Sequence, residues 1–254
     1  MQRFFLPASN IQSGRVVFSE AISRQMVQVL RLKPDERVTV LDGSGKEYLV
    51  RLTHLSMQSS EGEIENSHSS VGEPCTELTL YLCLTQREKF EWMLQKCTEV
   101  GASRFVPVIS SRSLVQDTKD VVSKYERWQR ILQEAAEQSY RGKVPMLESP
   151  LHLDQALKQA TQTGACCLIP WEEEKTLSLQ QALQMRPSKE VILLIGPEGG
   201  FSQEEVALAR AANFLSVTLG ERILRMETAA VVASALVLYE RGDMNCRSDQ
   251  AAGE

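Results

Sequence analysis

The first 70 or so residues carry short runs of alternating apolar and polar positions, which is the pattern of half-buried β-strands. Such runs occupy residues 15–18, 37–41 and 47–52. Residues 42–46, Asp-Gly-Ser-Gly-Lys, have the composition of a hairpin turn between the last two runs. Residues 19–30 place Ile22, Met26, Val29 and Leu30 on one helical face. This part of the chain is therefore predicted to form a short helix packed on a small sheet or barrel.

A change of pattern divides the chain. Residues 57–74 are rich in Ser and Glu and lack apolar periodicity, so they are predicted to be a loop or linker. Beyond them, apolar runs at 78–84, 105–109, 165–169, 191–195 and 215–219 alternate with helical segments. This alternation indicates an α/β domain with a largely parallel sheet. The predicted domains are residues 1–72 and 73–242, followed by a frayed tail at 243–254.

The predicted helices of the second domain differ in character. Residues 88–100 carry one apolar stripe and end at Gly101, and a second amphipathic helix contains Trp128. The last helix, about residues 227–239, is apolar all round apart from Ser234. Such a helix is expected to be buried on every side, either at the centre of the domain or in a subunit contact. A homodimer is one of these two alternatives.

The composition of the chain indicates where in the cell the protein acts and which cofactors it could bind. The chain of 254 residues is 43% hydrophobic and 24% charged with a net charge of −5, as expected for a globular protein that does not coat nucleic acid unspecifically. It has no apolar run near the roughly 20 residues of a membrane span, and its N-terminus is unlike a signal peptide, so a cytoplasmic location is expected. The six cysteines lack Cys-x-x-Cys spacing and the three histidines lack ligand spacing. We expect reduced core thiols, exposed histidines and no metal.

Two glycine-containing loops carry the candidate chemistry. Residues 192–206, Ile-Leu-Leu-Ile-Gly-Pro-Glu-Gly-Gly-Phe-Ser-Gln-Glu-Glu-Val, read as a buried strand, a glycine turn and a helix that starts with a capping box at Ser202 and Glu205. The turn lacks the Lys-Ser/Thr of a P-loop and the spacing of a dinucleotide fingerprint, and Glu198 would repel a phosphate. Residues 219–229, Leu-Gly-Glu-Arg-Ile-Leu-Arg-Met-Glu-Thr-Ala, form a second such loop. Both leave carboxyl ends of strands, where α/β sheets bind ligands, so the two loops are predicted to face one ligand that is not a polyphosphate.

These two loops, together with residues 134–141 (Glu-Ala-Ala-Glu-Gln-Ser-Tyr-Arg) and the start Arg-Phe-Phe-Leu-Pro at 3–7, resemble the RsmE family of SPOUT-class methyltransferases. The resemblance extends over nearly the whole chain. It implies an α/β fold with a SPOUT-type parallel sheet and a C-terminal trefoil knot, preceded by a small PUA-like β-barrel domain. It also implies methylation of N3 of a uridine in small-subunit (16S) ribosomal RNA, with S-adenosylmethionine as methyl donor. The expected partners are that RNA within the assembled 30S subunit and a second copy of the chain.

The resemblance assigns the donor site to the two loops, whose glycines would allow the backbone to approach the ligand closely. The cofactor-binding residues it implies are Ile195, Gly196, Pro197, Glu198, Gly199, Gly200, Leu219, Gly220, Ile223, Leu224, Thr228 and Ala229.

Two residues are candidates for catalysis. Arg225 is hypothesised to stabilise the negative charge that develops when a uridine loses its imide proton, and the alternative is a structural ion pair with Glu227 or Glu221. Glu198 is a candidate general base, and the alternative is that it holds the loop by accepting backbone N–H groups.

The predicted RNA contacts are Arg3, Arg31, Lys33, Arg141 and Lys143. For Arg141 and Lys143 the alternative is the ordinary preference for basic residues at the C-terminal end of a helix. In the first domain, Arg24-Gln25 and Asp35-Glu36 depart from the family pattern, and both pairs lie in the part of the chain that is expected to bind RNA. The rival functions are a non-catalytic RNA-binding or ribosome-assembly protein and a SPOUT methyltransferase that acts on transfer RNA.

Overall fold

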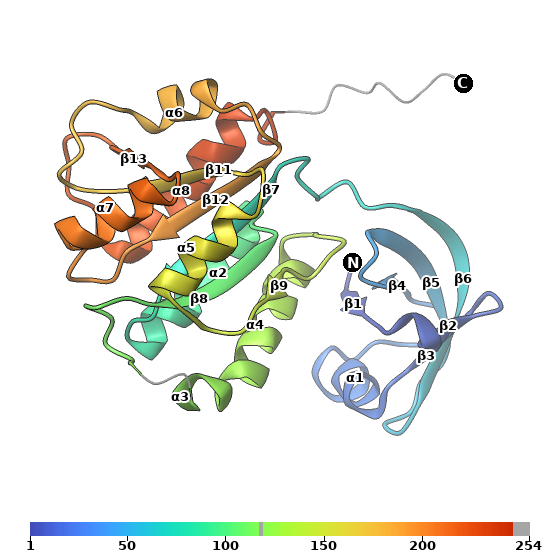
Figure 1. The fold of residues 1–254 in the computed structure, drawn as a ribbon. Helices are drawn as coiled ribbons and strands as arrows, with labels where there is room; N and C mark the ends of the chain where they lie inside the picture. The colour runs from blue at the N-terminus through green and yellow to red at the C-terminus, as the bar shows by residue number, and fades with distance from the viewer. Residues whose placement is uncertain (117–118, 246–254) are drawn as a thin grey trace, which may run out of the picture. The chain divides into compact units, whose positions relative to one another are not determined.

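The structure is a computed structural model that describes residues 1–116 and 119–245. The chain divides into two compact units (Figure 1). The first consists of Met1–Glu73 together with Gln133–Val144, and the second of Pro74–Leu132 and the described residues from Pro145 on. The frayed tail predicted at 243–254 lies mostly outside the described residues.

The first unit is a six-stranded sheet with the strand order β1-β4-β5-β6-β3-β2. Its strands are β1 (Arg3–Phe5), β2 (Ile11–Gln12), β3 (Arg15–Phe18), β4 (Arg37–Leu41), β5 (Lys46–His54) and β6 (Ser60–Ser69). Strands β4 and β5 pair antiparallel across the turn that the sequence predicted. The prediction of a loop across 57–74 was wrong, because β6 occupies most of it. This strand is held between β5 and β3 by backbone pairing, and most of its side chains are exposed, so apolar alternation is weak.

A helical segment closes the core of this unit. Short helix η1 (Ala8–Asn10) precedes β2, and helix α1 (Glu20–Arg24) continues directly into a π-helical turn, η2 (Gln25–Val29). The Ser19 side chain caps α1 by accepting from the Ile22 backbone N–H. Met26 is fully buried on the sheet, in contact with a core built from the inward-facing residues of the strands, which include Phe4, Phe18, Val38, Val40 and Val50. The predicted helix on a small sheet is confirmed.

The second unit contains a seven-stranded sheet in which the described strands all pair in parallel, as the sequence predicted. The strand order is β10-β8-β7-β12-β11-β13, and β9 also pairs with β8. The strands are β7 (Glu77–Cys83), β8 (Arg104–Ile109), β9 (Met146–Leu147), β10 (Leu151–His152), β11 (Cys166–Pro170), β12 (Glu190–Ile195) and β13 (Leu215–Val217).

Seven helices accompany this sheet in the described residues: α2 (Arg87–Val100), α3 (Lys119–Val122), α4 (Tyr125–Gln138), α5 (Leu153–Thr161), α6 (Leu179–Met185), α7 (Gln203–Ala211) and α8 (Met226–Glu240). Figure 1 shows α5 in front of the sheet and α8 behind it. Gly101 ends α2 with a positive φ of 127°, the predicted C-cap. Trp128 of α4 is buried against Phe90 of α2, with ring centroids 4.5 Å apart.

Helix α8 packs on α2, α6 and β12, but it is not buried on every side within one chain. Leu236 is 39% exposed and Tyr239 is 60% exposed. The first of the two predicted alternatives, burial at the centre of the domain, therefore does not hold for the single chain. The exposed side is apolar, which leaves the subunit contact as the alternative to consider. The strand pairings do not show whether the C-terminal segment is threaded through a knot, so the trefoil knot stays a prediction.

The described cysteines match the prediction of core thiols except at Cys75, and the histidines are exposed as predicted. Cys83, Cys97, Cys166 and Cys167 are unpaired and buried, whereas Cys75 is exposed and Cys246 lies outside the described residues. Burial raises the pKa of both Cys83 and Cys97 to about 12, so these thiols stay neutral. All three histidines are exposed. In residues 1–116 and 119–245 no three or more His, Cys, Asp or Glu side chains are grouped to hold a metal ion, and no described helix could cross a membrane.

Candidate active site

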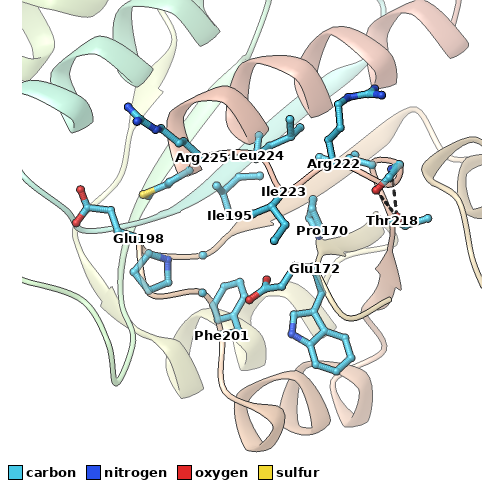
Figure 2. A pocket seen from close by; sticks show the side chains of 18 of the residues that line it. Pro170, Glu172, Ile195, Glu198, Phe201, Thr218, Arg222, Ile223, Leu224 and Arg225 are labelled. Atoms are coloured by element: carbon cyan, nitrogen blue, oxygen red, sulfur yellow. Dashed lines mark hydrogen bonds between the residues drawn. The ribbon is translucent and has the colours of Figure 1, made fainter. Parts of the chain in front are cut away.

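The candidate site lies where three neighbouring parallel strands end. Strands β12, β11 and β13 are adjacent in the sheet, and their carboxyl ends lie at one edge. The loops that follow them surround a cavity of about 280 Å³ (Figure 2). Its lining comes from Pro170, Trp171, Glu172, Lys175, from every residue from Ile195 to Phe201, from every residue from Thr218 to Met226, and from Ala229.

The loop after β12 depends on its glycines. Gly200 has a φ of +65°, and its N–H donates to the carbonyl oxygen of Pro197 at 2.9 Å. A Cβ at Gly200 would lie 2.6 Å from Oε1 of Glu172, and a Cβ at Gly196 would lie 2.9 Å from the Phe201 ring. Glycine at these two positions is therefore required by the fold of the loop itself. By contrast, a Cβ at Gly199 would meet only the Arg112 side chain, at an ordinary 3.5 Å.

The end of this loop is fixed by the predicted capping box. The Glu205 backbone N–H donates to Oγ of Ser202 at 3.2 Å, and the Ser202 backbone N–H donates to Oε2 of Glu205 at 2.9 Å. The other carboxylate oxygen of Glu205 accepts from the backbone N–H of Ser111 at 2.9 Å. The start of α7 is thus joined to the chain that follows β8.

Two basic side chains from other elements also hold the loop. The Lys89 ammonium of α2 forms an ion pair with Glu198, and Nη1 of Arg112 donates to the Gly199 carbonyl oxygen at 2.8 Å. The structural role considered for Glu198 was to accept backbone N–H groups, but in the described residues its carboxylate is bound by Lys89 instead. Glu198 is therefore anchored at the cavity wall by a charge from a neighbouring helix.

The loop after β13 presents apolar and cationic side chains to the cavity. Gly220 has a φ of +106°, a conformation that favours glycine, and its N–H donates to Oγ1 of Thr218 at 3.1 Å. Ile223 is 87% exposed at the mouth of the cavity, which leaves an apolar surface available to cover a ligand. Arg222 and Arg225 lie on opposite sides of Ile223 in Figure 2.

Arg225 is the residue that precedes α8, and its side chain is exposed at the cavity. In the described part of the chain its guanidinium forms no ion pair, so the structural pairing with Glu227 or Glu221 is not found. The guanidinium is therefore free to interact with a second molecule.

The cavity brings together the predicted donor-site residues with one exception. Thr228 is not among the lining residues and lies exposed on α8. A third loop, which was not predicted from the sequence, follows β11 and supplies Pro170, Trp171, Glu172 and Lys175. In Figure 2 the Glu172 carboxylate lies beside the Phe201 ring within the cavity. The rule that ligands bind at the carboxyl ends of parallel strands could have found this loop, since residues 165–169 were predicted to be a strand.

The third loop is held by a buried carboxylate, Glu174. Its Oε2 accepts from the Ser216 hydroxyl at 2.6 Å, and its Oε1 accepts from the hydroxyl and the backbone N–H of Thr176 at 2.6 and 2.9 Å. Nη2 of Arg210 also donates to Oε2 at 3.2 Å. The hydrogen bond from Ser216, followed by that from Thr176, lowers the pKa of Glu174 to about 2. Glu174 thus connects the loop after β11 to strand β13.

This network predicts a pH-dependent contribution to stability. The lowered pKa means that Glu174 stabilises the folded state fully above its unfolded pKa of about 4.3, and that this stabilisation is lost as the pH falls towards about 2. We expect Glu174→Gln to lower the free energy of unfolding by about 2 kcal/mol at pH 7 and by much less near pH 2. Urea unfolding of both proteins across pH 2–7 measures the difference.

The matched control is the neighbouring Glu173→Gln. Glu173 is exposed and accepts only from the Gln203 amide in the described structure, so its replacement should change stability by less than about 0.5 kcal/mol. Equal losses in the two variants, or a loss for Glu174→Gln that does not depend on pH, would contradict the role of the buried carboxylate.

Two of the predicted RNA-contact residues are buried in the first unit. The Arg3 side chain is 7% exposed and forms a two-pronged ion pair with Glu47, and Arg141 is 2% exposed and pairs with Glu73 at 2.8 Å. Both guanidinium groups are thus largely buried in ion pairs within the unit, and their contact with RNA stays a prediction. The other three candidates, Arg31, Lys33 and Lys143, are exposed.

Comparison with known protein families identifies both parts of the chain. Residues 72–238 match the family described as RNA methyltransferase domain, and residues 23–65 match the RNA methyltransferase PUA domain. Among curated relatives, ribosomal RNA small subunit methyltransferase E of Synechocystis is 32% identical over 236 residues, covering 92% of this chain and 76% of the relative. The protein of the same name from Bacillus subtilis is 30% identical, covering 96% of this chain and 100% of the relative.

Solved structures agree with these relatives. Ribosomal RNA small subunit methyltransferase E from Neisseria gonorrhoeae, bound to S-adenosylmethionine, matches with a TM-score of 0.85 and 32% identity over 94% of this chain and 97% of that chain. A Legionella pneumophila methyltransferase in complex with S-adenosylmethionine matches with a TM-score of 0.79 and 27% identity, over 93% of this chain and 96% of that chain.

Proposed function

Because the chain belongs to the ribosomal RNA small subunit methyltransferase E family, we propose that it transfers the methyl group of S-adenosylmethionine to N3 of a uridine in small-subunit ribosomal RNA. The observation that carries the proposal is the cavity at the ends of β12, β11 and β13, which gathers both glycine loops of the family motif. The expected place of action is the cytoplasm, and the expected substrate is the assembled 30S subunit. A folded ribonucleoprotein surface suits a protein with a net charge of −5, because bulk attraction to phosphates is weak.

The chemistry of the cavity fits the methyl donor. S-adenosylmethionine has a cationic sulfonium and an adenosine but no phosphate. The glycines at 196, 199 and 200 expose backbone groups for an adenine edge, and Ile195 and Ile223 supply apolar surface. Glu172 has no ion-pair partner among the described residues and offers a carboxylate to a cationic ligand. When bound, the donor supplies an electrophilic methyl group.

The residues around the cavity would contribute to catalysis mainly by positioning the donor and acceptor and by stabilising the charge that develops. N3 of uridine must lose its proton before it can attack, so negative charge develops on the ring and its oxygens. The Arg225 guanidinium, which forms no ion pair within residues 1–116 and 119–245, would stabilise that charge at the cavity. Glu198 remains a candidate for removing the proton, with its carboxylate oriented by Lys89. The three loops hold donor and acceptor in one orientation, which itself accounts for a large share of the acceleration.

Product analysis tests the proposal. The protein is incubated with labelled S-adenosylmethionine and with 30S subunits, naked 16S RNA or transfer RNA, and the labelled nucleoside is identified by mass spectrometry. We expect 3-methyluridine in the 30S sample. Label on a ribose, on another base or on transfer RNA would reject the substrate, and failure to bind the donor would favour a non-catalytic RNA-binding protein.

A homodimer is the second part of the proposal, supported by the apolar side of α8 that one chain leaves exposed at Leu236 and Tyr239. Twofold pairing would cover this side. Sedimentation should give about 57 kDa, twice the 28.5 kDa of one chain, and Leu236→Glu should shift the protein towards monomer. Leu208→Glu, at an exposed apolar position on α7, is the control. A wild-type protein that sediments as a monomer at micromolar concentration would contradict the dimer.

A further inference from the structure

The first unit presents an aromatic side chain in an unusual backbone conformation. Tyr140 follows the C-terminal end of α4 and has a φ of +61°, in the left-handed region that residues other than glycine seldom adopt. Its side chain is not used to fill a core, since the residue is 57% exposed. A bulky residue therefore occupies a position where glycine would cost less, and it stays largely exposed there.

The Tyr140 ring is nevertheless held in place from one side. The Arg3 guanidinium carbon lies 4.9 Å from the ring centroid, a cation–π contact. Arg3 is itself fixed, because its guanidinium binds both carboxylate oxygens of Glu47. The buried ion pair thus supports one face of an exposed ring.

The backbone around Tyr140 is equally constrained. A Cβ at Gly72 would lie 2.3 Å from the Tyr140 carbonyl oxygen, which shows how closely the two segments approach. Glu73 accepts from the backbone N–H groups of Gly142 and Lys143, both at 3.0 Å, and pairs with Arg141. The segment that carries the ring is therefore pinned to the chain after β6.

The same unit also exposes lysine side chains. Lys143 is exposed, and its side chain passes over the turn between β4 and β5, 3.2 Å from where a Cβ of Gly45 would be. The exposed ammonium group of Lys46 follows in the same turn and lies 5.1 Å from the Tyr48 ring centroid. A rigid aromatic ring can stack on a base, and exposed ammonium groups in the same unit can contact phosphates, which is how single-stranded nucleic acid is bound.

From these contacts we infer that Tyr140, supported by Arg3, is a stacking platform for an unpaired base of the RNA substrate. This inference rests on the proposed RNA methyltransferase function and adds a binding site in the first unit. It also gives Arg3 a role: the arginine holds the platform and does not itself contact RNA. A base in a duplex cannot reach the ring, so the platform favours unpaired RNA.

The test replaces Tyr140 with glycine, which removes the ring and suits the backbone conformation. Binding is measured by fluorescence anisotropy with a short single-stranded RNA and with a duplex of the same length. We expect Tyr140→Gly to bind the single strand about 10-fold more weakly and the duplex as the wild type does. The unfolding midpoint should not fall, since glycine adopts this φ freely. Tyr140→Phe, which keeps the ring, should bind like the wild type.

Ser13→Gly is the matched control, because Ser13 is exposed in the same unit, has a φ of +50° and has no aromatic side chain. It should leave RNA binding unchanged. Unchanged single-strand binding by Tyr140→Gly, or equal weakening for both RNAs, would overturn the platform and would point to a protein partner or a general charge effect. Methyl transfer to 30S subunits is measured with the same proteins. A wild-type protein that binds RNA but transfers no methyl group would contradict the proposed function without contradicting the stacking platform.

Discussion

Replacing Arg225 with alanine is expected to lower kcat for methyl transfer about 100-fold, since removal of one donor to a developing anion typically costs this much. The affinity for S-adenosylmethionine should change by less than about twofold, because the guanidinium acts on charge that arises during transfer and not on the cationic donor. The structure supports this separation: in the described residues Arg225 stabilises no ion pair that its loss would break. Single-turnover rates and calorimetric titration measure the two quantities.

Arg222→Ala provides a matched control for this variant. Arg222 belongs to the same loop and is also exposed, but it lies on the other side of Ile223 (Figure 2). If the loss of rate depends on the position of the guanidinium and not only on its positive charge, replacing Arg222 should reduce kcat by less than about threefold. Arg225→Lys should recover part of the lost rate, because it keeps the charge without the two-pronged geometry. Full turnover by Arg225→Ala would leave Arg225 without a catalytic role.

The second large effect concerns Gly199. Gly199→Val is expected to weaken binding of S-adenosylmethionine about 100-fold, which corresponds to about 2.7 kcal/mol. Gly199 lines the cavity, but the backbone at this position does not require glycine. Its φ is not positive, and a Cβ would meet only the Arg112 side chain, at 3.5 Å. The added methyl groups therefore occupy ligand space without distorting the loop. Calorimetric titration measures the affinity, and thermal unfolding checks the fold.

Gly164→Val is the control substitution. A Cβ at Gly164 would meet nothing within 4 Å, and this glycine precedes β11, outside the cavity lining. It should bind the donor as the wild type does. Gly200→Val is a poor test of the same idea, since its φ of +65° and the nearby Glu172 carboxylate would strain the loop directly. Wild-type affinity in a folded Gly199→Val protein would exclude close approach of the ligand to this loop.

The sequence by itself determined most of the elements and the centre of the site. Local signals suffice where a property repeats along a short stretch: alternation in β4 and β5, an apolar stripe in α2, and the capping box at Ser202. The glycine loops were recognisable because their motif is contiguous, and the family resemblance rests on those same stretches. The cavity gathers eleven of the twelve predicted donor-site residues because parallel strands end at one edge of a sheet.

Only the tertiary structure decided which side chains are available. From the sequence, Arg3 and Arg141 were predicted to contact RNA. In the structure they are buried in ion pairs with Glu47 and Glu73, which lie 44 and 68 residues away in the chain. Strand β6 is polar, so only its pairing with β5 and β3 reveals it. The third loop reaches the cavity because β11 inserts between β12 and β13, although β12 and β13 both come later in the chain. In each case the outcome depends on a contact between segments that are far apart in the sequence. A local pattern of residues does not include the energy of such a contact.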